Sequence, residues 1–168
     1  MKKIIFTVVA ITSLLGASFT AQAQKFGHLN AQTLLSQMPE VTTADKQLEE
    51  FNKSLEDQLK SMATEYQTKI ADYQAKVNLF TDAIKKVKEK EILDLETRIN
   101  EFQNSAQESV YQKKSELYAP ILKKAEEAVK IVAKENGYTY IFDTSVGALL
   151  YFAESDDILH LVKSKLGI

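Results

Sequence analysis

Residues 40–80 read EVTTADKQLEEFNKSLEDQLKSMATEYQTKIADYQAKVNLF, and they begin a stretch between Pro39 and Pro120 that contains neither glycine nor proline. A proline in the interior of a helix breaks or kinks it, and an interior glycine costs about 1 kcal/mol. A stretch of this length without either residue therefore predicts continuous helix.

Apolar side chains recur in this stretch at steps of three or four residues, which is the pattern of a helix that packs on another helix. The first run is Val41, Ala44, Leu48, Phe51, Leu55, Leu59, Met62, Tyr66, Ile70, Tyr73, Val77, Phe80, Ile84 and Val87. The second run is Ile92, Leu95, Ile99, Phe102, Ala106, Val110, Leu117, Ile121, Ala125, Ala128 and Val132. A single straight helix would leave both runs exposed, so we expect a long antiparallel helical hairpin. Frequent Ser, Thr, Gln and Asn beside the seam predict that its two arms are not tightly zipped.

No glycine or proline marks the bend of this hairpin. The best candidate is the lysine-rich segment at residues 85–91, because it lies near the midpoint between Pro39 and Gly137. The alternative is a bend at residues 78–82. For the lysine-rich segment itself, a solvated helix face is the competing interpretation.

The outer ends of the two arm helices carry clearer sequence signals than the bend between them. The first arm starts after Pro39, where Thr42 or Thr43 can cap the helix. The second arm ends at Gly137, a residue typical of helix C-termini. Pro120 should kink this arm or begin a new segment near Ala119.

Short segments on either side of the hairpin favour β-structure. Residues 26–30 predict a strand, and a helical turn over residues 32–38 should follow it. Residues 138–143 are rich in aromatic and β-branched residues and predict a second strand. A turn and a third strand at residues 148–152 would complete a C-terminal β-hairpin. The triplet Ser155-Asp156-Asp157 should cap a short last helix.

These strands and the last helix contain too few residues for an independent core. We therefore expect a mainly helical α+β fold, in which a long antiparallel helical hairpin projects from a small β-body that assembles by oligomerisation. Residues 24–38 and 137–168 would form the body, and residues 39–136 the arm. The candidate oligomer interface consists of Phe26, Leu29, Tyr140, Phe142, Leu149 and Tyr151.

Residues 1–23 have the features of a cleaved export signal. Lys2 and Lys3 precede a short apolar core, and Ala21-Gln22-Ala23 fits the small-x-small cleavage rule. The apolar run is short for a membrane anchor, which needs about 20 residues. We expect a mature chain that begins at Gln24 and is soluble in an extracytoplasmic compartment.

Composition excludes several classes of protein. The chain has no cysteine, which excludes disulfides and thiolate chemistry. Leaving out Lys2 and Lys3 from the 21 basic residues leaves 19 against 23 acidic ones, a net charge of −4 that gives no support to nucleic-acid binding. We found no phosphate-binding loop, catalytic motif, cofactor motif or metal-ligand spacing. The two histidines, His28 and His160, are expected to be ordinary surface or packing residues, and we predict no enzymatic activity.

Several aromatic and sulfur-containing side chains of the arm have two interpretations. Seam packing is the simpler one. The functional one is that some of them contact nonpolar segments of an unfolded protein, here called a client, through many weak contacts. The candidates for client contact are Met62, Tyr66, Tyr73, Phe80 and Phe102.

The order of these elements resembles the Skp (OmpH-like) family of periplasmic chaperones over essentially the whole mature chain. The most specific pieces are Gln37-Met38-Pro39, the strand Tyr140-Ile141-Phe142-Asp143 and the helix start Asp156-Asp157-Ile158. The resemblance implies a homotrimer whose three arms enclose a cavity. It also implies a periplasmic, ATP-independent chaperone for unfolded outer-membrane β-barrel proteins, with neither cofactor nor catalytic residues.

The charge of the arm departs from this family, whose best-known members have basic arms. Residues 40–135 contain 16 basic and 19 acidic side chains, a net charge of −3. Electrostatic attraction of clients, or a weak contact with a membrane surface, would then fall to the lysines near the arm tip: Lys85, Lys86, Lys88 and Lys90. The alternative function is a structural or adaptor coiled-coil protein that binds one folded partner through its arm tips.

Overall fold

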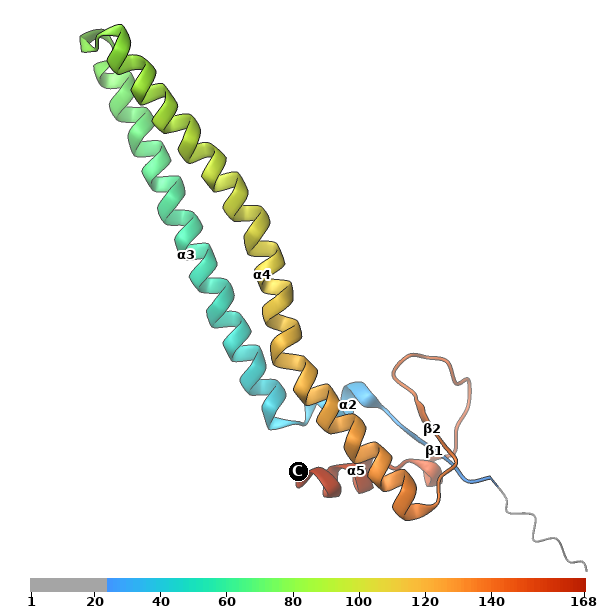
Figure 1. Cartoon of the computed structure of the whole chain (residues 1–168). Coiled ribbons are helices and arrows are strands. Elements are labelled where there is room, and N and C mark those ends of the chain that lie inside the picture. The colour runs from blue at the N-terminus through green and yellow to red at the C-terminus, as the bar shows by residue number, and fades with distance from the viewer. Residues whose placement is uncertain (1–23) are drawn as a thin grey trace, which may run out of the picture.

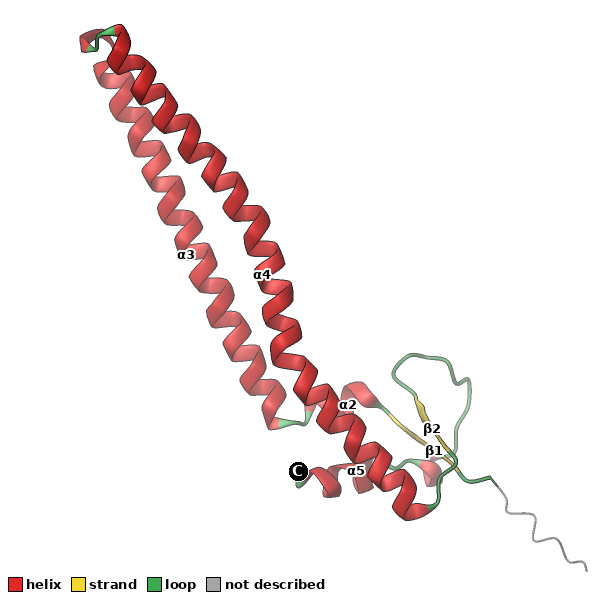
Figure 2. Ribbon diagram, in the orientation of Figure 1, coloured by secondary structure: helices red, strands yellow, loops and turns green. Residues whose placement is uncertain are grey.

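The structure is a computed structural model that describes residues 24–168, so the predicted export signal lies outside the described residues. A long arm of two helices projects from a small body (Figure 1). The arm consists of α3 (Pro39–Lys76) and α4 (Asp82–Asn136), of 38 and 55 residues. The predicted α+β fold, mainly helical with an antiparallel hairpin, is confirmed (Figure 2). None of the helices in residues 24–168 has the length and apolar character needed to cross a membrane.

The hairpin bends at its alternative position, and the prediction of a bend in the lysine-rich segment 85–91 is wrong. After α3, a short 3-10 turn (Val77–Leu79) leads to Thr81, whose hydroxyl oxygen accepts a hydrogen bond from the backbone N–H of Ile84 at 3.4 Å. Thr81 thus caps α4, which begins at the next residue. The lysine-rich segment continues the helix because Lys and Glu are good helix formers.

The first arm helix begins earlier than predicted, and neither Thr42 nor Thr43 caps it. Pro39 is its first residue, preceded by Met38 in an extended conformation. Proline suits this position because the first N–H groups of a helix have no partner within it. Thr43 lies inside the helix and donates its hydroxyl to the carbonyl of Pro39 at 3.2 Å.

The second arm helix continues through Pro120 without interruption, so of the two predicted outcomes, a kink or a new segment near Ala119, the new segment is wrong. Proline has no N–H to donate to the preceding turn. Figure 1 shows α4 bowed along its length, and the part of the helix that packs in the body core begins at Ile121. Pro120 therefore marks the junction between arm and body. The helix ends at Gly137 (φ 70°), as predicted.

Both strands flanking the arm are confirmed, and they pair in parallel. Strand β1 (Phe26–Leu29) lies beside β2 (Tyr140–Asp143), with Phe26 opposite Tyr140. Helix α2 (Ala31–Ser36) follows β1, as the predicted helical turn required. The parallel pairing results from the hairpin, which leaves the body and returns to it between the two strands.

The prediction of a third strand at residues 148–152 is wrong. This segment forms no strand in the described chain, and Leu150 is fully exposed. The chain crosses instead to the other edge of β1. There His28 Nε2 lies 2.9 Å from the carbonyl oxygen of Ala153, and His28 forms a parallel bridge with Asp157. This crossing carries the segment away from β2, so it cannot form a hairpin with that strand.

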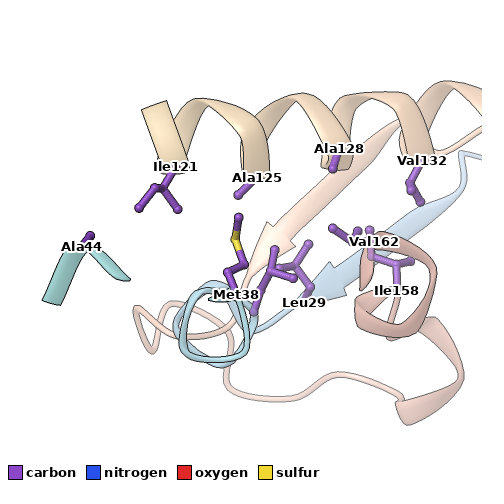
Figure 3. Packing of buried hydrophobic residues seen from close by; sticks show 10 residues of the cluster. Leu29, Met38, Ala44, Ile121, Ala125, Ala128, Val132, Ile158 and Val162 are labelled. Atoms are coloured by element: carbon purple, nitrogen blue, oxygen red, sulfur yellow. The ribbon is translucent and has the colours of Figure 1, made fainter. Parts of the chain in front are cut away.

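The body buries a core of its own, contrary to the expectation that it lacks enough residues. The missing wall is the base of α4, whose side chains point into the body from one face (Figure 3). Helix α5 (Leu159–Leu166) closes the core, and Asp157 accepts a hydrogen bond from the N–H of Leu159 at 2.8 Å. The buried cluster consists of Leu29, Leu34, Met38, Ala44, Ile121, Ala125, Ala128, Val132, Ile158 and Val162.

Asp143, at the end of β2, connects the strand to the start of α2. Its Oδ1 accepts hydrogen bonds from the backbone N–H groups of Ala31 (3.1 Å) and Ser145 (2.8 Å). Partial burial raises the pKa of Asp143, but these bonds and one from the Ser145 hydroxyl together hold the pKa below its ordinary value.

We predict that Ile158→Ala lowers the free energy of unfolding by about 3 kcal/mol, because it leaves a cavity at a fully buried position. Leu93→Ala, at an exposed position on α4, is the matched control and should change the free energy by no more than about 0.5 kcal/mol. Urea unfolding followed by circular dichroism measures both. Equal effects of the two substitutions would contradict the packing described above.

We predict that Asp143→Asn reduces the acid sensitivity of the fold. A carboxyl group whose pKa is lowered by folding stabilises the protein above its unfolded-state pKa, and this contribution is lost as the pH falls through the folded-state pKa. The variant should be less stable than wild type at neutral pH, and the difference should shrink below about pH 4. Urea unfolding at both pH values measures this. Asp94→Asn is the control, since that exposed side chain makes no hydrogen bond within residues 24–168.

Candidate functional site

The seam between the two arm helices is only partly closed. Between residues 45 and 120, Leu95 is the single buried side chain, at 3% exposure. The five apolar residues predicted to contact a client are all half-buried: Met62, Tyr66, Tyr73, Phe80 and Phe102. The arm therefore presents partly exposed apolar surface along much of its length.

Two of these candidates meet at the arm tip. The rings of Tyr73 and Phe80 lie 6.2 Å apart, centroid to centroid. The Tyr73 hydroxyl donates to the carboxylate of Glu89 on α4, and this bond raises the pKa of Tyr73. Leu79, in the bend beside them, is 83% exposed. The tip thus combines two aromatic rings with an exposed aliphatic side chain.

Other exposed apolar residues of the arm were not among the predicted contacts. The clearest are Leu79 and Leu93, both more than half exposed. Neither of them lies on the seam of three- and four-residue steps. A large apolar side chain outside that seam is the signal that would have identified them from the sequence.

The four lysines near the tip do not act as a single positive cluster. Lys85 lies 3.9 Å from Asp82, and Lys88 lies 3.0 Å from Glu91, whose pKa its hydrogen bond lowers. Lys86 and Lys90 are exposed, and neither forms an ion pair within residues 24–168. Half of the positive charge predicted to attract clients is therefore neutralised within the arm.

A cleft of about 630 Å³ opens between α3 and α4 halfway along the arm. We call it the mid-arm cleft. Its apolar lining consists of Leu55 and Leu59 on α3 and of Phe102, Ala106 and Val110 on α4. Its polar lining consists of Asn52, Glu56, Gln103 and Gln107. Phe102 is the only predicted contact residue in this set.

The sheet carries three aromatic rings on its outer side, here called the aromatic face. Phe26 stacks on Tyr140 at 5.8 Å, and Phe142 lies 6.2 Å from Phe26 and 6.4 Å from Tyr140. All three are more than a third exposed. The structure thus brings together three of the six residues predicted for the oligomer interface.

The other three predicted interface residues lie apart from the aromatic face. Tyr151 is 85% exposed and Leu149 is half-buried, both in the loop after β2. Leu29 is buried in the chain's own core, so its assignment to an exposed interface is corrected. Leu29 is buried while Phe26 is exposed because successive side chains of a strand point to opposite sides. Phe26 and Leu29 are three residues apart, so they lie on opposite sides of β1.

A second cavity, here called the basal pocket, lies where α2, α4 and β2 meet. Its volume is about 260 Å³, and its lining is mostly apolar, including Leu35, Leu122, Val129 and Ile141. Its acidic lining residues are Glu126 and Asp143. No group of His, Asp or Glu within residues 24–168 has the arrangement needed to hold a metal ion.

The comparisons with known proteins concern the same stretch of chain. A family model described as Outer membrane protein (OmpH-like) matches residues 25–166. A solved structure from Caulobacter crescentus CB15, provisionally described as an outer membrane chaperone (OmpH-like), has a TM-score of 0.76 and 10% sequence identity. The match covers 86% of this chain and 84% of that chain. At this identity the likeness shows the fold alone. No curated protein matches the sequence.

Proposed function

Because the chain belongs to the OmpH-like outer membrane protein family, we propose that it is an ATP-independent chaperone that holds unfolded outer-membrane β-barrel proteins and prevents their aggregation. One observation carries the proposal: a long projecting arm in which, between residues 45 and 120, the apolar side chains are half-buried or exposed and Leu95 is the single buried one. The description of the Caulobacter relative as an outer membrane chaperone supports it.

The proposed site of action is the periplasm. The export signal expected at residues 1–23 would deliver the chain there, and Gln24 would begin the mature protein. We assign residues 24–38 and 137–168 to the body and residues 39–136 to the arm, whose base also lines the body's core. The proposal needs no cofactor, no nucleic acid and no catalytic group.

The proposed assembly is a homotrimer joined through the bodies, with three arms around a cavity. The aromatic face supports it, since contiguous exposed apolar surface marks interaction sites. The basal pocket and the exposed Leu150 support it further. A protruding apolar side chain and an apolar pocket at different places on one chain suit a head-to-tail contact, and such contacts can close into rings.

The proposed binding mode relies on short-range contacts. The arm has a net charge of −3, so long-range attraction of acidic clients is not available to it. Many weak apolar contacts on three linked arms can together hold a client firmly while each contact remains labile. Lys86 and Lys90 are the proposed points of weak contact with a membrane surface.

The holdase proposal predicts that the protein suppresses aggregation without ATP. A urea-unfolded outer-membrane β-barrel protein is diluted into buffer with one trimer per client, and light scattering is followed. We expect scattering to fall to near the baseline, while the client diluted alone should scatter strongly. Undiminished scattering would refute the proposal. Capture of one folded partner at a fixed ratio would favour the adaptor function.

The assembly proposal predicts that Phe142→Asp and Tyr151→Asp each give monomers, because a charge in an apolar interface is costly unless it is paired. Tyr111→Asp is the control, at an exposed position on the arm. Light scattering after size-exclusion chromatography measures the mass, and circular dichroism verifies the fold. If both variants remain trimeric, the interface lies elsewhere.

A further inference from the structure

The mid-arm cleft exists because the seam loses volume at one position. Ala106 lies between Phe102 and Val110 on α4, at four-residue intervals, and the same cavity is lined by Leu55 and Leu59 from α3. A methyl group at the central position leaves the opposing side chains without contact atoms, so the helices enclose space there instead of packing. The cleft thus coincides with a small residue, Ala106, that has a larger apolar residue one helical turn away on either side.

The lining of the mid-arm cleft carries less charge than that of two other hollows along the arm. Nearer the tip, the lining includes Lys69, Asp72, Lys88 and Glu91, and a groove nearer the base has several acidic residues. In the mid-arm cleft Glu56 is the only charged residue. Its remaining polar groups are primary amides, each of which both donates and accepts hydrogen bonds. The cleft thus combines apolar surface with neutral hydrogen-bonding groups.

The spacing of the apolar residues matches an extended peptide. Leu55 and Leu59 are four residues apart, which places them about 6 Å apart along the helix axis. Phe102, Ala106 and Val110 repeat the same interval on the opposite wall. Alternate side chains of an extended strand lie about 6.8 Å apart on one face. A strand lying along the cleft would therefore place an apolar side chain beside each apolar residue in turn along the two walls.

We propose that the mid-arm cleft binds an extended segment of unfolded polypeptide in which apolar and polar residues alternate. The apolar side chains enter between the helices, and the amides of Asn52, Gln103 and Gln107 bond to the N–H and C=O groups of the segment's backbone. This inference rests on the proposed function and specifies where on the arm a client is held. A hydrocarbon chain fits less well, because it would desolvate the three amides and offer them no partner.

The test fills the cleft in the full-length trimer. Ala106→Trp places a large ring at the centre of the cavity, and Ala75→Trp, at an exposed position on α3, is the matched control. The probe is a fluorescein-labelled peptide of about ten residues, the length of a membrane-spanning β-strand, in which Val and Thr alternate. We expect Ala106→Trp to weaken peptide binding at least tenfold, as measured by fluorescence anisotropy, and Ala75→Trp to leave it unchanged.

A second variant keeps the inference testable if Ala106→Trp does not fold. The double substitution Gln103→Leu and Gln107→Leu removes two amides without closing the cavity. It should weaken binding of the peptide and strengthen binding of a fluorescent long-chain fatty acid. Wild-type protein that binds the fatty acid in preference to the peptide would overturn the inference.

Failure of this inference and failure of the proposed function are distinguishable. If Ala106→Trp binds the peptide as wild type does and still suppresses aggregation, the cleft is not the site but the holdase function stands. If wild type neither binds the peptide nor suppresses aggregation, both are refuted.

Discussion

The packing of the base of α4 against the body is the contact on which the rest of the structure depends. Ile121, Ala125, Ala128 and Val132 follow at steps of four, three and four residues and form one buried face. The two alanines allow the sheet, Met38 and α5 to approach the helix closely, as Figure 3 shows. Through this face, the two ends of the chain, separated by the whole arm, share one core. The arm is held in place because its second helix is also the wall of that core.

Burial divides the molecule into two parts with different stability. Of the eleven buried hydrophobic side chains in residues 24–168, ten belong to the body cluster, and the arm beyond it has only Leu95. Segments with few buried apolar contacts open at lower free-energy cost than the core does. A tightly zipped coiled coil would bury the apolar side chains that a client needs to reach. The partly open seam is therefore the condition for the proposed function, and the body supplies the stability that the arm lacks.

The sequence predicted the hairpin, both paired strands and the stop at Gly137, because periodicity and glycine report directly on local structure. It misplaced the bend, because the midpoint between Pro39 and Gly137 was used as the guide and the cap at Thr81 was not. It assigned a strand to residues 148–152 from composition, and the bridge between His28 and Asp157 overrode that preference. It also missed the core of the body. The spacing of Ala125 and Ala128 is the same whether that part of the helix packs against the other arm helix or against the body. Periodicity shows that a face is buried but not what covers it.

The chemistry of the candidate site follows the same division between what is local and what is not. The residue types of the arm were visible in the sequence, but the cleft depends on which side chains of α3 oppose Ala106, and only the tertiary register decides that.

The charge of the arm is a second constraint on how it can bind. At physiological ionic strength, interactions between exposed charges are screened beyond about 8 Å, and several arm lysines are already paired, as Lys69 is with Glu91 at 3.6 Å. An arm of this kind exerts little attraction at a distance. Under the proposed function, selection among clients would then occur at contact, where alternating apolar side chains and backbone hydrogen-bonding groups are the features that an unfolded β-barrel strand can offer.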